Sequence, residues 1–62
     1  MDATLYFHLT DRIREAMTAD ALRALGAEID RVDAHDFERR ALRKLVARRE
    51  ELLASHHIVF TA

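Results

Sequence analysis

The sequence has no cysteine and no proline, and its only glycine is Gly26. Without cysteine, disulfide bridges and thiolate metal sites are excluded. Proline and glycine are the residues that most disfavour a helix interior, whereas alanine, leucine, arginine and glutamate, which dominate this chain, are strong helix formers. The sequence therefore predicts a mainly α-helical protein, and residues 1–62 are few enough to form one small helical domain.

The small net charge and the short apolar runs restrict the location and the partners of the protein. A net charge of −1 gives no overall field that attracts nucleic acid or a membrane surface. No apolar run approaches the roughly 20 residues that a membrane span needs, and no signal peptide is recognisable. We therefore expect a cytoplasmic protein. Nine arginines against one lysine, with abundant alanine, are typical of a GC-rich bacterial genome or its phage.

The sequence offers no set of catalytic residues. Ser55 is the only serine, no glycine-rich loop is present to hold a phosphate, and the carboxylates have the spacing of helix surfaces and caps. A chain this small also has little room for a buried pocket, where the pKa values of catalytic groups are shifted. We expect a protein that is not an enzyme and that uses no cofactor and no small-molecule substrate.

The four histidines are interpreted as surface or helix-end residues. His8 and the adjacent His56 and His57 would gather only if the two termini met, and two adjacent histidines on a strand point to opposite faces. We therefore predict no metal site.

Two stripes of apolar residues recur at helical spacing in the first half of the chain. The first contains Leu5, Leu9, Ile13, Ala16 and Met17, and the second contains Leu22, Leu25, Ile29 and Val32. On one straight helix the stripes would face nearly opposite directions, so we predict a break between them, with Thr18 as the N-cap of the second helix. This places helices at about 10–17 and 19–31, with Thr10 capping the first. Gly26 would allow another backbone to approach the second helix.

A second break is predicted at "DRVDAHDF", with Asp33 as the N-cap of a last helix over about 34–55. The end segments "ATLYFHL" and "HHIVFTA" mix aromatic and β-branched residues, so short extended segments at both termini are an alternative to helix there. A plain two-helix hairpin, with helices at 3–31 and 34–56, is the other alternative to the three-helix unit.

Association is expected because the chain is small. A domain of this length buries only about 60% of the surface that its unfolded chain exposes. One hairpin or three-helix layer leaves an apolar face that a second layer must cover. We therefore predict a helical homodimer, in which two copies supply the missing layer.

A basic ridge is predicted on the last helix. It consists of Arg39, Arg40, Arg43, Lys44 and Arg48. Arg49 falls near the apolar face, where it would snorkel or pair with an acid across a dimer interface. The ridge is interpreted either as a solvated outer face or as a site that contacts phosphates. The pI of about 6.4 and the acidic first half, in which residues 1–36 carry eight acidic and four basic residues, favour the solvated face.

These patterns favour a non-enzymatic small regulatory or inhibitor protein that acts by helix-mediated binding to another protein. Aromatic side chains dominate binding hot spots, so we predict the partner-binding residues in the apolar end segments. They are Leu5, Tyr6, Phe7, Ile58, Val59 and Phe60. The alternatives are a regulator that binds RNA or DNA through the basic ridge and a structural subunit of a larger assembly.

Overall fold

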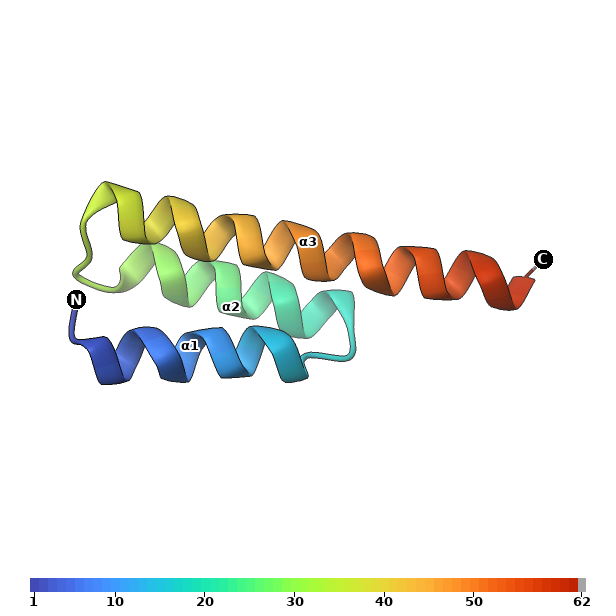
Figure 1. The fold of residues 1–62 in the computed structure, drawn as a ribbon, viewed down its shortest axis with the longest axis horizontal. Coiled ribbons are helices and arrows are strands. Elements are labelled where there is room, and N and C mark those ends of the chain that lie inside the picture. The colour runs from blue at the N-terminus through green and yellow to red at the C-terminus, as the bar shows by residue number, and fades with distance from the viewer. Residues whose placement is uncertain (62) are drawn as a thin grey trace.

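The computed structural model describes the backbone of residues 1–61 and the side chains as far as Ser55. It contains three helices in the order α1 (Ala3–Glu15), α2 (Ala19–Arg31) and α3 (Asp36–Thr61), with no strand in these residues. Figure 1 shows that α2 runs antiparallel to both α1 and α3, and that α3 continues past the ends of the other two. The mainly α-helical, three-helix prediction is confirmed.

The break between α1 and α2 is where the sequence predicts it. Thr18 has an extended backbone, and its hydroxyl accepts a hydrogen bond from the Ala21 N–H at 3.1 Å, so it caps α2. The reversal at this point lets Ile13 and Leu22, which would face opposite directions on one straight helix, both enter the core. The alternative of one continuous helix over 3–31 is therefore wrong.

Helix α1 begins earlier than predicted. Asp2 is its N-cap and accepts a hydrogen bond from the Thr4 N–H at 3.4 Å, so the helix starts at Ala3 and includes the segment for which extended structure was an alternative. Thr10 lies in the middle of the helix, and its hydroxyl donates to the Tyr6 carbonyl at 2.9 Å. It is not a cap, because the apolar stripe that buries Leu9 continues towards the N-terminus and keeps the preceding turns helical.

Helix α3 begins two residues later than predicted and is longer. The N-cap is His35, whose carbonyl accepts from the Arg39 N–H at 3.0 Å and whose own N–H donates to Glu38 at 3.0 Å. This is the backbone-to-carboxylate half of a capping box, and it takes the role that the sequence assigned to Asp33. The backbone stays helical to Thr61 because no proline or glycine interrupts the segment.

One small core joins all three helices. The buried residues are Leu9, Ile13, Ala16, Leu22, Leu25, Ile29, Leu42 and Val46. In each helix they recur three or four positions apart, which is the spacing that puts side chains on one face. Fully burying one leucine or isoleucine side chain contributes about 1.5–3 kcal/mol, so eight residues, of which one is alanine, make a thin core.

Two arginines of α3 cap the carboxyl ends of the other helices. Arg39 donates to the carbonyls of Ile29 at 3.3 Å and Val32 at 2.9 Å, at the end of α2. Arg49 donates to the carbonyl of Ala16 at 2.9 Å, at the end of α1. Helix ends leave carbonyls without partners, and a cation there also offsets the negative end of the helix dipole. Within one chain, the partner of Arg49 is therefore a backbone carbonyl.

The Arg49 contact generates a prediction about stability. Replacing Arg49 with alanine leaves the carbonyl end of α1 without its charged donor, so we expect the free energy of unfolding to fall by about 1–2 kcal/mol. Urea denaturation measures this change. The neighbouring exposed Arg48→Ala is the control and should stay within about 0.5 kcal/mol of the parent. Equal effects of the two substitutions would contradict the capping role.

Gly26 generates a prediction of the opposite sign. A Cβ added at Gly26 would meet nothing within 4 Å, so no described part of the chain makes the close backbone approach that the sequence suggested. Glycine in a helix interior is less favourable than alanine by about 0.8–1.0 kcal/mol. We therefore expect Gly26→Ala to raise the free energy of unfolding by roughly that amount in the same urea experiment, whereas a loss of stability would show that the site is occupied.

Candidate docking surface between α1 and α3

Most of the exposed large apolar side chains lie where α1 and α3 run beside each other. Phe7 on α1 is 66% exposed and Phe37 on α3 is 69% exposed, and both line one surface depression. Leu52, which is 52% exposed, lines a second depression between the same two helices. Met17, which is 73% exposed, follows the end of α1 and contacts Arg49 at 3.6 Å. Isolated exposed apolar residues are ordinary, whereas several that gather between the same two helices make a candidate interaction site.

The two depressions lie one after the other along the line where α1 and α3 run beside each other, and we call this strip of surface the α1/α3 groove. From α1 it is lined by Ala3, Tyr6, Phe7, Thr10, Ile13 and Arg14. From α3 it is lined by Phe37, Glu38, Ala41, Leu45, Arg48, Arg49 and Leu52. On each helix these positions recur three or four residues apart, so they form one continuous stripe along the helix. Met1 closes the groove at the end where both helices begin.

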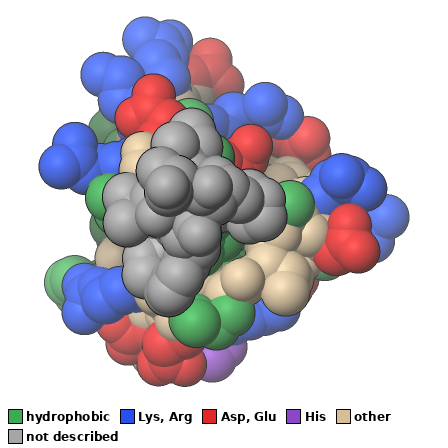
Figure 2. All heavy atoms as spheres, turned by 90° about the vertical axis from the view of Figure 1, so that its right-hand side faces the viewer, with side chains coloured by type: hydrophobic (Ala, Val, Ile, Leu, Met, Phe, Trp, Pro, Cys, Tyr) green, Lys and Arg blue, Asp and Glu red, His purple; other side chains and the backbone are tan. Residues whose placement is uncertain are grey.

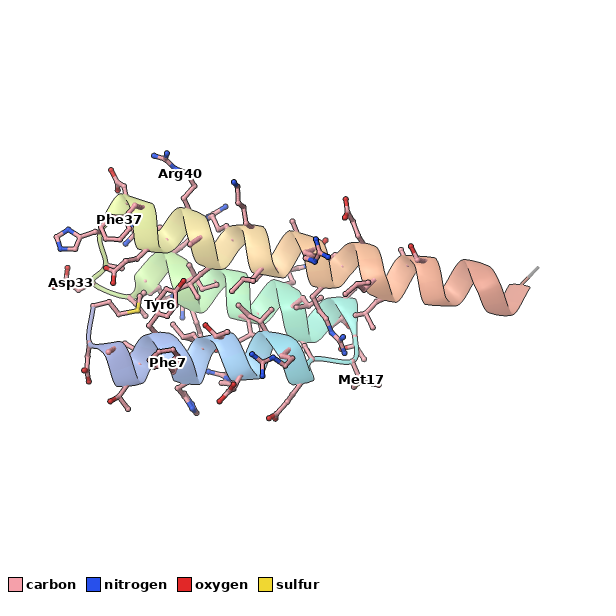
Figure 3. All side chains as sticks on the ribbon, viewed as in Figure 1. Tyr6, Phe7, Met17, Asp33, Phe37 and Arg40 are labelled. Atoms are coloured by element: carbon pink, nitrogen blue, oxygen red, sulfur yellow. The ribbon has the colours of Figure 1, made fainter. Side chains whose placement is uncertain are left out.

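Aromatic side chains form the end of the groove near the start of both helices. Figure 3 shows Phe7 on α1 and Phe37 at the beginning of α3. Phe7 packs edge-to-face with the half-buried Tyr6, with ring centroids 6.2 Å apart, and Phe37 stacks on His35 at 5.7 Å. Tyr6 also packs against the core, so it fixes the base of this cluster, whereas the two phenylalanines present their rings to solvent.

Glu38 joins the same end of the groove to the chain terminus. Its carboxylate accepts from the His35 N–H at 3.0 Å and lies 3.3 Å from the Met1 ammonium. The hydrogen bond from His35 holds the pKa of Glu38 below its ordinary value, and the ammonium group acts in the same direction. One carboxylate therefore caps α3 and holds the N-terminus against it.

The structure divides the predicted basic ridge into two groups. Arg39 is occupied by the carbonyls at the end of α2, and Arg43 forms an ion pair with Asp30 of α2. Arg40, Lys44 and Arg48 are exposed and form no ion pair with any side chain that the structure describes. These three are spaced four residues apart, so they form one stripe along α3. Figure 3 shows Arg40 pointing away from the other helices.

On the α2 side of the molecule, by contrast with the exposed stripe of α3, most cations form ion pairs. There Arg12 pairs with Glu28 at 2.7 Å and Arg23 with Asp20 at 3.4 Å. The Arg12 guanidinium lowers the pKa of Glu28, as expected for an opposite charge within hydrogen-bonding distance. Seen along its long axis, the molecule carries cationic and anionic side chains interspersed around the bundle (Figure 2). Apart from Arg31 at the end of α2, the exposed cations without a described ion-pair partner are on α3, namely Arg40, Lys44 and Arg48.

The predicted partner-binding residues are separated by the fold. Leu5 is only 38% exposed and Tyr6 is half-buried, so Phe7 is the most accessible of the three on α1. The side chains of Ile58, Val59 and Phe60 lie outside those that the structure describes. Figure 1 places the start of α1 and the C-terminal end of α3 at opposite ends of the molecule, so the two segments do not meet within one chain.

Phe37, which lines the groove, and Met17, which contacts the groove residue Arg49, were not among the predicted binding residues. Phe37 and Met17 stand at the edges of apolar stripes, and a stripe does not reveal which edge a neighbouring helix covers.

Among the side chains as far as Ser55, no three histidine, aspartate or glutamate residues gather to hold a metal ion. Within the described residues, no helix combines the length and apolarity that a membrane span requires.

Comparison of the chain with protein-family models, with curated proteins and with solved structures gives no match. The functional proposal therefore depends on the geometry of the groove and on the charges beside it.

The role of Glu38 predicts a pH dependence of stability. Because its pKa in the folded state is lowered from 4.5, the contribution to stability is present above the unfolded-state value of 4.5 and is lost as the pH falls through the lower folded-state value. We expect the urea midpoint of the parent protein to fall more between about pH 5 and pH 3 than that of Glu38→Gln. The exposed Glu51→Gln is the control and should follow the parent. A Glu38→Gln curve parallel to the parent would contradict the prediction.

Proposed function

We propose that this protein is a non-enzymatic binding protein, of the small regulatory or inhibitor kind, that docks on another protein through the α1/α3 groove. The observation that carries the proposal is the pair of phenylalanines, Phe7 and Phe37. They come from two different helices, are 66% and 69% exposed, and line one depression. Exposed aromatic residues grouped in this way have the character of binding hot spots.

The shape of the groove suits a helix. Helix α1 has 13 residues, which corresponds to a length of about 20 Å, and α3 runs beside it over this length. A helix that lies on two neighbouring helices at an axial separation of about 8–10 Å gives the four-helix arrangement common in helical bundles. The depressions are open at the surface, and small-molecule sites are usually more enclosed.

A second copy of the chain is one occupant to consider, and it would give the homodimer that the sequence predicts. A structural subunit of a larger assembly would use the same groove permanently. Light scattering of the purified chain distinguishes these cases, since self-association is visible without any added partner.

A second candidate function is the binding of RNA or DNA. The observation in its favour is the stripe of exposed cations formed by Arg40, Lys44 and Arg48. Because Arg39 and Arg43 are engaged within the chain, the predicted ridge of five cations is reduced to three. With three phosphate contacts on a duplex, the logarithm of the binding constant would fall against the logarithm of the salt concentration with a slope of only about −2.7. Such a slope indicates weak and non-specific binding.

The proposed function predicts that loss of the exposed aromatic rings removes partner binding. The parent chain is first used to capture a binding protein from its own host. We expect the double variant Phe7→Ser/Phe37→Ser to lose binding to that protein, and the control Ala27→Gln on α2 to keep it. The purified partner should then bind the parent and not the double variant in isothermal calorimetry. Since both rings are largely exposed, their substitution should change the unfolding midpoint little. Equal binding by the parent and the double variant would overturn the proposal.

A further inference from the structure

We propose that the occupant of the α1/α3 groove is an acidic amphipathic helix of another protein, whose carboxylates lie along the edge that faces Lys44 and Arg48. This inference rests on the proposed function and specifies the chemistry of its partner.

Cations border the second half of the groove from both sides. Arg48 of α3 and Arg14 of α1 both line the depression that contains Leu52. Lys44 lies one helical turn before Arg48. Neither Lys44 nor Arg48 has an ion-pair partner among the described side chains. Arg14 has only Asp11, at 3.8 Å, and both of these side chains are exposed.

An apolar floor lies between these cations. Ile13, Leu45 and Leu52 line the same depression as Arg14 and Arg48. Leu45 and Leu52 are seven residues apart, which is two helical turns, and Phe37 lies two further turns towards the start of α3. A partner helix of about 15 residues spans this distance and would meet the floor with apolar residues at positions i, i+3/i+4 and i+7. The residues at the edge of its apolar face would then lie beside Lys44 and Arg48.

A second copy of the chain does not supply the missing negative charge. A two-fold interface uses the same surface on both copies. If α3 lies on α3, Lys44 and Arg48 of one copy meet the same two cations and the single acid Glu51 of the other, so the edge keeps a net positive charge. The groove carboxylate Glu38 is already held by the His35 N–H and the Met1 ammonium. If α3 lies on α1, its cations meet Asp11 and Arg14, whose charges cancel, because Glu15 lies on the other side of α1 in the groove with α2. Like charges placed together oppose binding, so acids from a different chain fit this surface better.

Nucleic acid fits the surface less well than an acidic helix does. Phosphates would contact the cations but would leave the apolar floor of Leu45 and Leu52 uncovered. The aromatic rings that could stack on bases, Phe7 and Phe37, line the other depression, away from Arg14 and Arg48. An amphipathic helix covers the floor and pairs with the cations at the same time.

The test is a displayed library of 18-residue helical peptides. Each peptide carries a fixed leucine face, and the positions flanking that face are randomised among glutamate, glutamine and lysine. The full chain is the bait. Selected peptides are then titrated by fluorescence anisotropy against the parent, Lys44→Ala/Arg48→Ala, the charge-matched control Arg23→Ala/Arg31→Ala, and Phe7→Ser/Phe37→Ser. A 20-base-pair DNA duplex and a structured RNA hairpin are titrated in parallel.

We expect glutamate to be enriched at the flanking positions on one edge. Affinity for the selected peptides should fall about two- to thirtyfold in Lys44→Ala/Arg48→Ala, because two exposed ion pairs are lost, and should be kept in Arg23→Ala/Arg31→Ala. Binding that is lost in Phe7→Ser/Phe37→Ser but shows no glutamate enrichment would overturn this inference and leave the proposed function standing. No peptide binding, or binding unaffected by the phenylalanine substitutions, would overturn both.

Two further outcomes would also overturn the inference. If light scattering shows a dimer whose formation depends on Phe7 and Phe37, the occupant is a second copy. If the duplex or the hairpin binds more tightly than every selected peptide, and Lys44→Ala/Arg48→Ala removes that binding, the cations serve nucleic acid.

Discussion

The burial of Leu42 and Val46 of α3 together with apolar residues of α1 and α2 is the interaction on which the rest of the structure depends. Neither short helix has 15 residues, and isolated helices of that length are marginal in water. Their stability therefore comes from packing on α3. The core is thin, and it leaves the outer edges of each apolar stripe exposed. The α1/α3 groove is one consequence, because both helices present aromatic or aliphatic side chains there.

The arginines of α3 serve two purposes, and tertiary contacts decide which residue serves which. Arg39 and Arg49 lie ten residues apart, about 15 Å along the helix, and donate to the ends of α2 and α1. These contacts fix the position of α3 along both helices. Arg40, Lys44 and Arg48 have no such role in the described part of the chain and stay available beside the groove. A single basic segment thus contributes to the fold and to the candidate docking surface.

The candidate site was only partly predictable. Phe7 was predicted as a binding residue and is exposed, but its neighbour in the groove is Phe37, about 30 residues later in the chain, and not the C-terminal apolar segment. Periodicity shows that Phe37 flanks an apolar face, and it does not show whether α1 or α2 covers that flank. The basic ridge was also visible in the sequence. Its division depended on carbonyl groups and on the Asp30 carboxylate at the end of α2, and no local pattern reveals these contacts.

The sequence by itself determined the helical class, the break at Thr18, the break before α3 and most of the core residues, because these follow from helix propensity, capping and periodicity, which are local. The true start of α1 was missed, since aromatic and β-branched residues near Tyr6 weaken the local helical signal and packing of Leu9 overrides it. Only the tertiary structure decided which arginines are engaged, which apolar residues stay exposed and where the groove lies. Each of these depends on the side of a helix that a neighbour covers, and that is set by contacts between residues distant in the chain.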